Sequence, residues 1–469
     1  MLSMKRRGAA RLAAAVVASG LVAAGAIATA GTAAADETTP THGGATATLG
    51  GLKTFDQAVV HNDGGDQRVG AGLFEMAVDN GGTLQTYCID IHNPTQQQAK
   101  YQEVPWSASS LHNNGDAGKI RWILQNSYPQ VNDLAALASK AGAGNLTEKT
   151  AAAGTQVAIW RFSDHAKVDA VDPAAEKLAD YLEKSAQNVG EPKASLTLDP
   201  PAVSGKSGGK LGPVTVRTNA DSVTIAPGAG AAAGVKVVGK DGKAVTSAAD
   251  GTQLFFDVPK GAADGSTSLT AQAATKVPVG RAFTGIGVHA KSQTQILAGS
   301  SESTVSAAAT ASWKKQGAIP AITAEKNCAK GGVDVTATNK GDEAFRFQLS
   351  GKDFEIAPGK SQTVTVPVAE DQPYNITIKG EGGFKKSFSG VLDCKTAGSG
   401  GGKPSTQPSP ASVGGSTGGS AGGDKGGDLA ETGSSNATPM IAGIAVVLVV
   451  VGGASVFFLR KKKTGTPAQ

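Results

Sequence analysis

Residues 72–90, GLFEMAVDNGGTLQTYCID, contain two short alternating stretches on either side of a turn. Apolar or small residues occupy every second position from Gly72 to Val78, and the alternation resumes over 84–89. Asp79-Asn80-Gly81-Gly82, between them, is typical of a tight turn. We therefore predict a β-hairpin whose second strand ends at Tyr87-Cys88-Ile89-Asp90.

Three helices are predicted downstream of this hairpin, each from a capping residue followed by apolar residues at helical spacing. Asp116 can cap the first helix. Thr147 can cap the second helix, which runs to about Phe162. Asp172 can cap the third helix, which starts at a proline. Three of the four Trp residues also lie between 36 and 192, so we expect the best-packed core there. Hairpin and helices together predict an α+β domain over residues 36–192.

After residue 192 the sequence changes to short alternating runs separated by Gly, Pro, Asp and Asn. This spacing predicts two β-sandwiches of immunoglobulin-like type, at residues 193–316 and 317–396, that act as stalk domains. Neither has His, Asp and Glu clustered in the sequence at metal-binding or acid–base spacing, so we expect no metal and no cofactor. The runs on which the prediction rests are 211–216, 254–258, 333–338, 363–368 and 374–378.

The first 35 residues have the parts of a signal peptide. Lys5-Arg6-Arg7 is a positive segment, Leu12 to Ala30 is an apolar run, and Ala33-Ala34-Ala35 offers a cleavage site. We expect residues 1–35 to be removed and the mature chain to be exported. An uncleaved membrane anchor is the alternative.

The C-terminal end combines a linker with an apolar run. Residues 397–428 contain 12 Gly, 6 Ser and 3 Pro among 32, which predicts a disordered, wall-spanning linker with a span of roughly 30 Å. Leu429-Ala430-Glu431-Thr432-Gly433 follows, then an uncharged run at 440–459 that is long enough for a transmembrane helix, and a basic cytoplasmic tail at 460–469. This order resembles the cell-wall sorting signal of Gram-positive surface proteins, in its LAxTG variant.

The resemblance implies that a sortase cleaves between Thr432 and Gly433. The Thr432 carbonyl then passes through an acyl-enzyme to a peptidoglycan amine, so the membrane holds the chain only before sorting and the mature protein is anchored in the cell wall. A plain single-pass membrane protein is the alternative.

The positive net charge is concentrated in these two ends. Residues 1–35 and 433–469 carry four basic residues each and no acidic ones, and without them the formal net charge falls from +5 to −3. Nucleic acid is therefore not expected as a partner.

Three cysteines in an exported chain leave one unpaired. Cys328 and Cys394 bracket the last predicted sandwich, so we expect a disulfide bond between them. Cys88 is then the odd cysteine, which is either buried and inert or chemically committed.

A second segment, Thr155-Gln156-Val157-Ala158-Ile159-Trp160, lies on the second predicted helix. Gln156 shares the apolar face of that helix, and a buried amide without partners costs about 1–3 kcal/mol, so it should be hydrogen-bonded or transformed. The motifs Tyr-Cys-Ile-Asp at 87–90 and Thr-Gln-x-Ala-x-Trp at 155–160 together resemble the thioester (TQxA) domains of Gram-positive surface proteins, over roughly residues 50–190.

The resemblance implies an internal thioester between Cys88 Sγ and Gln156 Cδ, formed with loss of ammonia. A primary amine on a target surface would attack Gln156 Cδ, expel the Cys88 thiolate and remain attached as an amide. The expected protein is thus an adhesin and not an enzyme. We expect Tyr87, Thr155 and Trp160 to surround the bond, and Asp90 or a neighbouring His to take the proton of the amine. Core packing and, for Asp90, turn capping are the alternative roles.

Two other functions fit parts of the sequence. A passive cell-wall spacer would leave Cys88 as a buried free thiol. A Cys-dependent hydrolase or transpeptidase would pair Cys88 with His92, His112 or His165. An intact mass lower by one ammonia distinguishes the thioester form from both.

Overall fold

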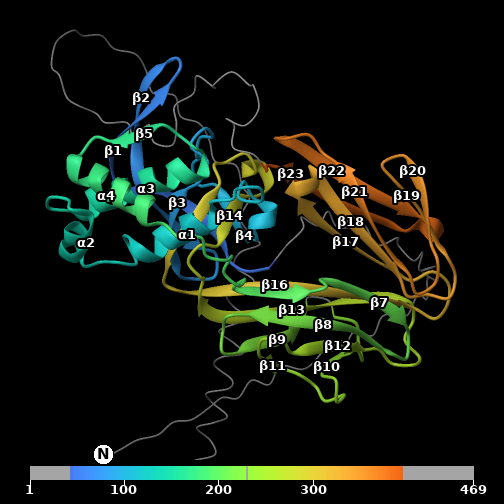
Figure 1. Ribbon diagram of the computed structural model, residues 1–469. Coiled ribbons are helices and arrows are strands. Elements are labelled where there is room, and N and C mark those ends of the chain that lie inside the picture. Colours follow the sequence, from blue (N-terminus) through green and yellow to red (C-terminus); the bar gives the residue numbers. More distant parts are fainter. Residues whose placement is uncertain (1–42, 229–230, 395–469) are drawn as a thin grey trace, which may run out of the picture. The chain divides into compact units, whose positions relative to one another are not determined.

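The computed structural model describes residues 43–228 and 231–394 (Figure 1). The predicted signal peptide, linker, sorting motif, membrane span and basic tail lie outside these residues. Within the described ranges, no helix is both long and apolar enough to cross a membrane.

A seven-stranded sheet organises the N-terminal domain. Its strand order is β2-β3-β15-β14-β4-β1-β5, and β1 also pairs with β2, so six of the strands close into a ring. The predicted hairpin is confirmed as β2 and β3, with Phe74 opposite Thr86 and Ala77 opposite Thr83. The strands are β1 (Thr46–Asn62), β2 (Gly65–Val78), β3 (Thr83–Cys88), β4 (Lys100–Val104), β5 (Val168–Ala170), β14 (Ala282–Gly285) and β15 (Gln295–Ser300).

Two of these strands, β14 and β15, come from the segment that we expected to lie in the sandwich at 193–316. β15 pairs with β3, placing Gln295 opposite Cys88, while β14 pairs with β4. An alternating run specifies a strand but not the sheet that it joins, because the partner is chosen by tertiary packing. The N-terminal domain is therefore built from two separate parts of the chain.

Helices cover this sheet, and two of the predicted caps are confirmed. Thr147 Oγ1 accepts a hydrogen bond from the Thr150 backbone N–H at 3.2 Å, and the Asp172 carboxylate accepts from the N–H groups of two following residues. Asp116 precedes the first helix without capping it through its side chain, and pairs with Lys119 at 2.9 Å. The helices are α1 (Ala117–Asn126), α2 (Leu134–Ala141), which the sequence analysis did not predict, α3 (Glu148–Ser163) and α4 (Pro173–Ser185).

Helix α3 is the central element of the domain. Every residue from Thr150 to Trp160 is buried, and the helix contacts β1, β2 and β3 as well as α1 and α4. Gly154 permits the close approach of α4, since a Cβ there would lie 2.4 Å from the Ala175 carbonyl oxygen. This packing fixes both the position and the rotation of α3.

The middle domain consists of two facing sheets. Strands β10-β12-β8-β6 form one sheet and β11-β9-β13-β16-β7 the other, and Phe256 of the first shares a core with Leu269 of the second. The predicted strand at 211–216 lies within β8, and the one at 254–258 is confirmed as β12, which ends at Asp257. Bounds are β6 (Leu196–Asp199), β7 (Ala202–Lys206), β8 (Lys210–Thr218), β9 (Val223–Pro227), β10 (Lys236–Val238), β11 (Ser247–Ala248), β12 (Gln253–Asp257), β13 (Gly265–Lys276) and β16 (Glu302–Lys314).

The C-terminal described domain is a second pair of sheets, β17-β18-β21 and β20-β19-β22-β23. Val335 from one sheet and Phe347 from the other belong to one core, and the expected disulfide between Cys328 and Cys394 is present. Bounds are β17 (Pro320–Asn327), β18 (Gly332–Asn339), β19 (Phe345–Leu349), β20 (Lys352–Ile356), β21 (Ser361–Pro367), β22 (Gln372–Gly380) and β23 (Lys385–Leu392). Short 3₁₀ turns occupy Trp106–Ala108, Gly287–His289, Cys328–Lys330 and Glu381–Gly383.

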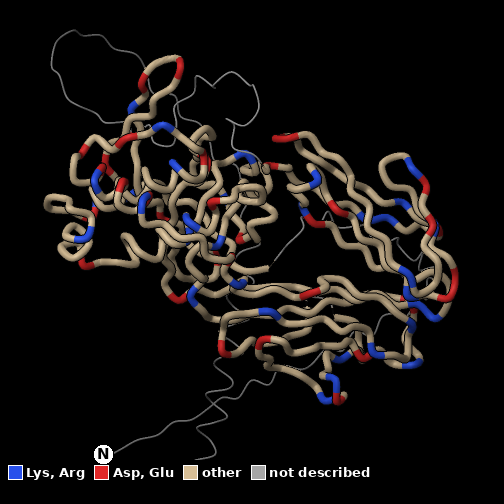
Figure 2. The backbone as a smooth tube through the Cα atoms, in the orientation of Figure 1, with Lys and Arg blue, Asp and Glu red and all other residues tan. Residues whose placement is uncertain are grey.

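Charged residues of both signs are interspersed along the described backbone (Figure 2). The basic segments of the sequence, at 5–7 and 460–463, lie outside the described ranges. The described residues therefore carry charges of both signs along the chain rather than one basic stripe.

Candidate functional site

The end of β3 and the middle of α3 bring Cys88 and Gln156 together. The Cys88 backbone N–H donates to Gln156 Oε1 at 2.9 Å, and Gln156 Nε2 donates to the Cys88 carbonyl oxygen at 2.8 Å. Both residues have no exposed surface. The amide predicted to need a partner thus has two, and both belong to the cysteine with which the sequence analysis paired it.

Backbone groups beyond β3 hold the thiol in this position. The Asp90 N–H donates to Cys88 Sγ at 3.2 Å, and the Ile89 N–H donates to the Thr294 carbonyl oxygen at 3.1 Å. Cys88 is the single free cysteine of the described residues. The thiol of Cys88 and the amide of Gln156 therefore lie next to each other in one buried site.

The electrostatic surroundings keep the thiol protonated. Burial raises the pKa of Cys88 well above its usual value, and the negative charges of Asp164 and Asp90 add to the rise. The indole N–H of Trp160 lies close enough to lower this pKa in part, although Trp160 Nε1 makes no hydrogen bond within the described residues. The thiolate form of Cys88 is therefore disfavoured at neutral pH.

Two carboxyl groups flank the thiol: Asp90 is fully buried and Asp164 is partly buried. Asp90 accepts a hydrogen bond from Asn93 Nδ2 at 2.6 Å through one oxygen, while its Oδ1 has no partner in the described part of the chain. Burial, followed by the charges of Asp393 and Asp164, raises the pKa of Asp90 well above its usual value. A buried carboxyl group of this kind can carry a proton near neutral pH.

Asp164 is a site residue that the sequence analysis missed. It follows α3 directly, accepts the Ile91 N–H at 3.1 Å and the Ser163 hydroxyl at 2.6 Å, and burial raises its pKa to about 6. The signal available in the sequence was an acidic residue at the C-terminal end of a helix, where the dipole disfavours negative charge.

Three other predicted site residues are buried around the pair. The Tyr87 hydroxyl donates to the Tyr128 carbonyl oxygen at 2.8 Å, and the Thr155 hydroxyl donates to the Ala151 carbonyl oxygen of its own helix at 2.7 Å. Like Trp160, neither has exposed surface. These contacts exclude water from the site and fix the ends of β3 and α3.

The segment leading into β15 closes the site with side chains that no local sequence signal identifies. Gln295 accepts a hydrogen bond from the Thr86 hydroxyl at 2.9 Å and donates to Gln293 at 3.0 Å, and Gln293 in turn donates to the Asp90 carbonyl oxygen at 2.9 Å. This polar network connects residues 282–300, which contain β14 and β15, to the end of β3 that carries Cys88.

The histidines considered for a hydrolase do not complete a Cys–His pair. Burial lowers the pKa of His92, and His112 contacts the Ser109 carbonyl oxygen. His165 lines a shallow pocket with Arg161 and Asp169. Within the described residues, no hydrogen bond joins Cys88 to any of the three.

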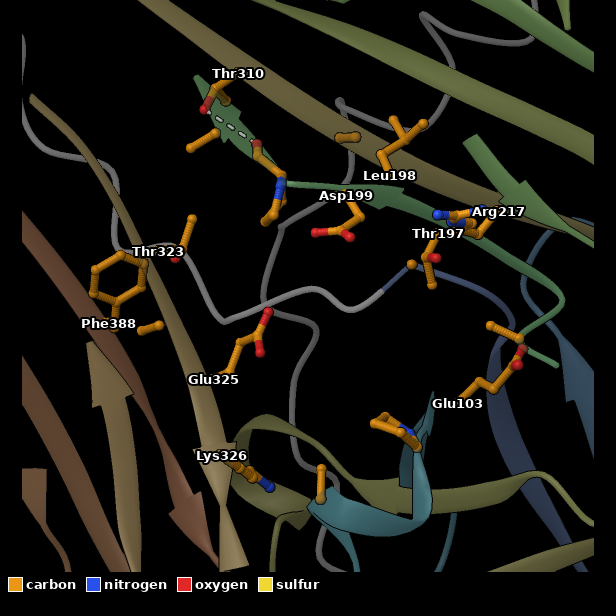
Figure 3. A pocket seen from close by; sticks show the side chains of 18 of the residues that line it. Glu103, Thr197, Leu198, Asp199, Arg217, Thr310, Thr323, Glu325, Lys326 and Phe388 are labelled. Carbon is orange, nitrogen blue, oxygen red and sulfur yellow. Dashed lines mark hydrogen bonds between the residues drawn. The ribbon is translucent and has the colours of Figure 1, made fainter. Parts of the chain in front are cut away.

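A pocket of about 480 Å³ lies elsewhere in the molecule (Figure 3). Its lining includes Glu103, Asp199, Arg217, Glu325 and Lys326, but neither Cys88 nor Gln156. It therefore adds nothing to the chemistry of the buried pair.

Comparison with known families identifies the domain that contains this pair. Residues 85–188 match the model of the family described as "Thioester domain", and the matched range includes both Cys88 and Gln156. This chain contains a thioester domain. Residues 320–391 match a second family, described as "Bacterial phospholipase C, C-terminal domain", which corresponds to the C-terminal sandwich.

Solved structures similar to this thioester-domain protein include two with related titles. "The Bacillus anthracis TIE protein" is 14% identical, with a TM-score of 0.27, covering 75% of this chain and 81% of the other. "Thioester domain of the Enterococcus faecium TIE86 protein" is 18% identical, with a TM-score of 0.25, covering 60% and 100% respectively. No curated protein matches the chain.

Proposed function

We propose that this chain is a bacterial surface adhesin that attaches covalently to amine-bearing targets through a thioester between Cys88 and Gln156. The observation that carries the proposal is the pair of hydrogen bonds, at 2.9 and 2.8 Å, that hold the Gln156 amide against Cys88 in a fully buried site. The family match of residues 85–188 supports it.

Formation of the bond uses groups already in place. Cys88 Sγ attacks Gln156 Cδ, the thiol proton and the amide nitrogen leave together as ammonia, and a carbon–sulfur bond replaces the carbon–nitrogen bond. The Cys88 N–H stabilises the negative charge that develops on Oε1, as a backbone donor does in an oxyanion hole. The Asp90 N–H stabilises the sulfur as its proton departs.

Proton transfer falls to the flanking carboxyl groups. The pKa of Asp164 is raised to about 6 by burial, which suits a group that accepts the thiol proton and returns it to the departing nitrogen. During capture of a target, proton transfer is needed again, because the attacking amine must lose a proton while Cys88 regains one. Asp90 and Asp164 are the titratable side chains whose charges act on Cys88.

Capture exchanges the thioester for an amide between Gln156 Cδ and the amine, and it frees the Cys88 thiol. The raised pKa of that thiol favours its protonation after release. Because the product is stable and Gln156 is consumed, each chain reacts once. We therefore propose attachment rather than enzymatic turnover.

Wall anchoring is the second part of the proposed function, and it rests on sequence. Leu429 to Gly433, the apolar run at 440–459 and the basic tail fit sortase-mediated transfer of Thr432 to a peptidoglycan amine. The thioester domain would then be displayed at the far end of two β-sandwich domains and a linker.

The deciding experiment compares the intact mass of the full chain with that of Cys88→Ala. After the substituted atoms are accounted for, the wild-type protein should be lighter by one ammonia, and methylamine should add one amine at Gln156 and expose one thiol. Cys88→Ser provides a matched control that keeps a hydroxyl in place of the thiol. A wild-type chain at full sequence mass with a freely alkylated Cys88 would favour the passive spacer.

A further inference from the structure

One buried tryptophan of the thioester domain has an indole N–H without an acceptor. Trp160 has no exposed surface, and its Nε1 makes no hydrogen bond within the described residues. By contrast, Trp106 Nε1 donates to the Gly280 carbonyl oxygen at 2.8 Å. Trp313 Nε1 donates to the Ala263 carbonyl oxygen at 2.7 Å. A buried donor without a partner is unfavourable, so packing, which a phenylalanine could provide, does not account for the indole at 160.

The position of Trp160 on α3 places this N–H beside the reactive pair. One turn earlier, Gln156 bonds to both backbone groups of Cys88. One turn later, directly after the helix, Asp164 accepts the Ile91 N–H. Residues four apart share a helix face, so Trp160 lies between two side chains that contact the end of β3 and the residues after it. Its N–H also acts on the sulfur, since it opposes the rise in the pKa of Cys88 that burial causes.

The Cys88 sulfur becomes a better acceptor during the proposed reaction than it is at rest. A thiol or thioester sulfur accepts hydrogen bonds weakly, whereas a sulfur that takes the electron pair of a breaking bond is negatively charged and accepts them strongly. The Asp90 N–H already donates to it at 3.2 Å. Burial, and then the negative charges of Asp164 and Asp90, raise the pKa of Cys88. A second donor would therefore ease the departure of the thiolate.

We propose that Trp160 is a catalytic residue whose indole N–H donates a hydrogen bond to Cys88 Sγ as the thiolate leaves. This inference rests on the thioester function proposed above. The primary amine forms its bond to Gln156 Cδ, and the carbon–sulfur bond breaks with its electron pair going to Sγ. The proton that the amine nitrogen loses is finally taken up by the thiolate. The indole is not consumed; it stabilises the charge on sulfur until that proton arrives.

This role predicts a dependence on the basicity of the amine. A weakly basic amine leaves the tetrahedral intermediate more readily than a strongly basic one, so its capture depends more on how easily the thiolate departs. Loss of the indole N–H should therefore slow the capture of aminoacetonitrile, a weakly basic amine, more than that of methylamine. A packing defect would slow the capture of both small amines to the same extent.

The test follows the release of the Cys88 thiol when each amine is added to the full chain, in the wild type and in Trp160→Phe. The variant should keep the mass deficit of one ammonia, since a bond that forms more slowly still forms. It should capture aminoacetonitrile slower than the wild type by on the order of tenfold, with a smaller effect on methylamine. Trp313→Phe, which replaces a buried tryptophan on β16 of the middle sandwich, should react as the wild type.

Replacement of Trp160 by the non-natural 3-benzothienylalanine guards against a packing or folding defect. Its sulfur takes the place of the N–H while the two-ring shape is kept, so it should show the same selective loss. Wild-type rates in this variant, equal slowing of both amines, or loss of the mass deficit in a folded variant would overturn the proposal and leave the thioester of the wild type in place. A wild-type chain without the mass deficit would instead contradict the proposed function, and this inference with it.

Discussion

Gln156 is an amide in the middle of an otherwise apolar buried helix, and its partners are the two backbone groups of Cys88. Each of these hydrogen bonds contributes about 1 kcal/mol net, but losing one leaves a buried backbone group unsatisfied. The side chain therefore stabilises the strand end as well as offering its carbonyl carbon for the proposed reaction.

This double role predicts different stabilities for the two variants that block thioester formation. Cys88→Ala keeps both backbone hydrogen bonds, whereas Gln156→Ala leaves the Cys88 N–H and carbonyl oxygen without them. We expect Gln156→Ala to be less stable than Cys88→Ala by about 1–3 kcal/mol, measured by urea unfolding of methylamine-treated chains. Equal stabilities would show that the two hydrogen bonds contribute nothing.

Asp164 predicts a pH dependence. Burial raises its pKa to about 6 in the folded chain, against about 3.9 for an unfolded aspartate. The folded state binds this proton more tightly, so stability is fully present below about pH 4 and declines until about pH 6, by on the order of 3 kcal/mol.

Asp164→Asn stays neutral throughout. Its stability relative to the wild type should therefore increase from about pH 4 to above pH 6, as measured by urea unfolding at both ends of that range. The remaining titratable groups are common to both chains and cancel in the difference. A difference that does not change with pH would contradict the assigned pKa.

At the scale of elements, the contact between α3 and α4 depends on one glycine. Gly154→Ala would place a Cβ 2.4 Å from the Ala175 carbonyl oxygen and 3.1 Å from Leu178 Cβ. We expect a loss of about 1–3 kcal/mol despite the higher helix propensity of alanine. Gly144→Ala, which meets only Ala174 Cβ at 4.0 Å, is the control and should change thermal stability little.

The same elements show how much of the structure could be predicted from the sequence. The hairpin and two capped helices followed from local patterns, because turn residues, caps and apolar spacing act over a few positions. The pairing of Cys88 with Gln156 came from the resemblance of two motifs to the thioester-domain family. Asp164 and the Gln293–Gln295 network were not identified, since their roles come from contacts with distant residues.

At the scale of the whole molecule, the thioester domain depends on β14 and β15, which follow most strands of the middle sandwich in the sequence. A fragment ending at residue 192 would lack β14 and β15, leaving β3 and β4 without the partners that they have here. We expect residues 36–192 to unfold without cooperativity and to show no mass deficit. The matched fragment of residues 36–316 should unfold cooperatively and should show the mass deficit of one ammonia. Circular dichroism and intact mass measure these two properties.

Wall display can be tested in the producing cell. Thr432→Ala removes the residue whose carbonyl a sortase would transfer, so the variant should stay in the membrane fraction while the wild type is released by digestion of the wall. Release of the variant by wall digestion alone would refute the sorting assignment. Ser435→Ala, beyond the motif, should behave as the wild type.

The pairing of β15 with β3 also sets an order of events during biosynthesis. Thr86 and Gln295, which hydrogen-bond beside Cys88, are 209 residues apart. Because a chain is made and exported from its N-terminus, Cys88 and Gln156 emerge well before the strand that closes their site. The site is completed only after residue 300 has followed, so the proposed thioester would form late, away from the amine-rich cytoplasm in which an earlier thioester would be consumed.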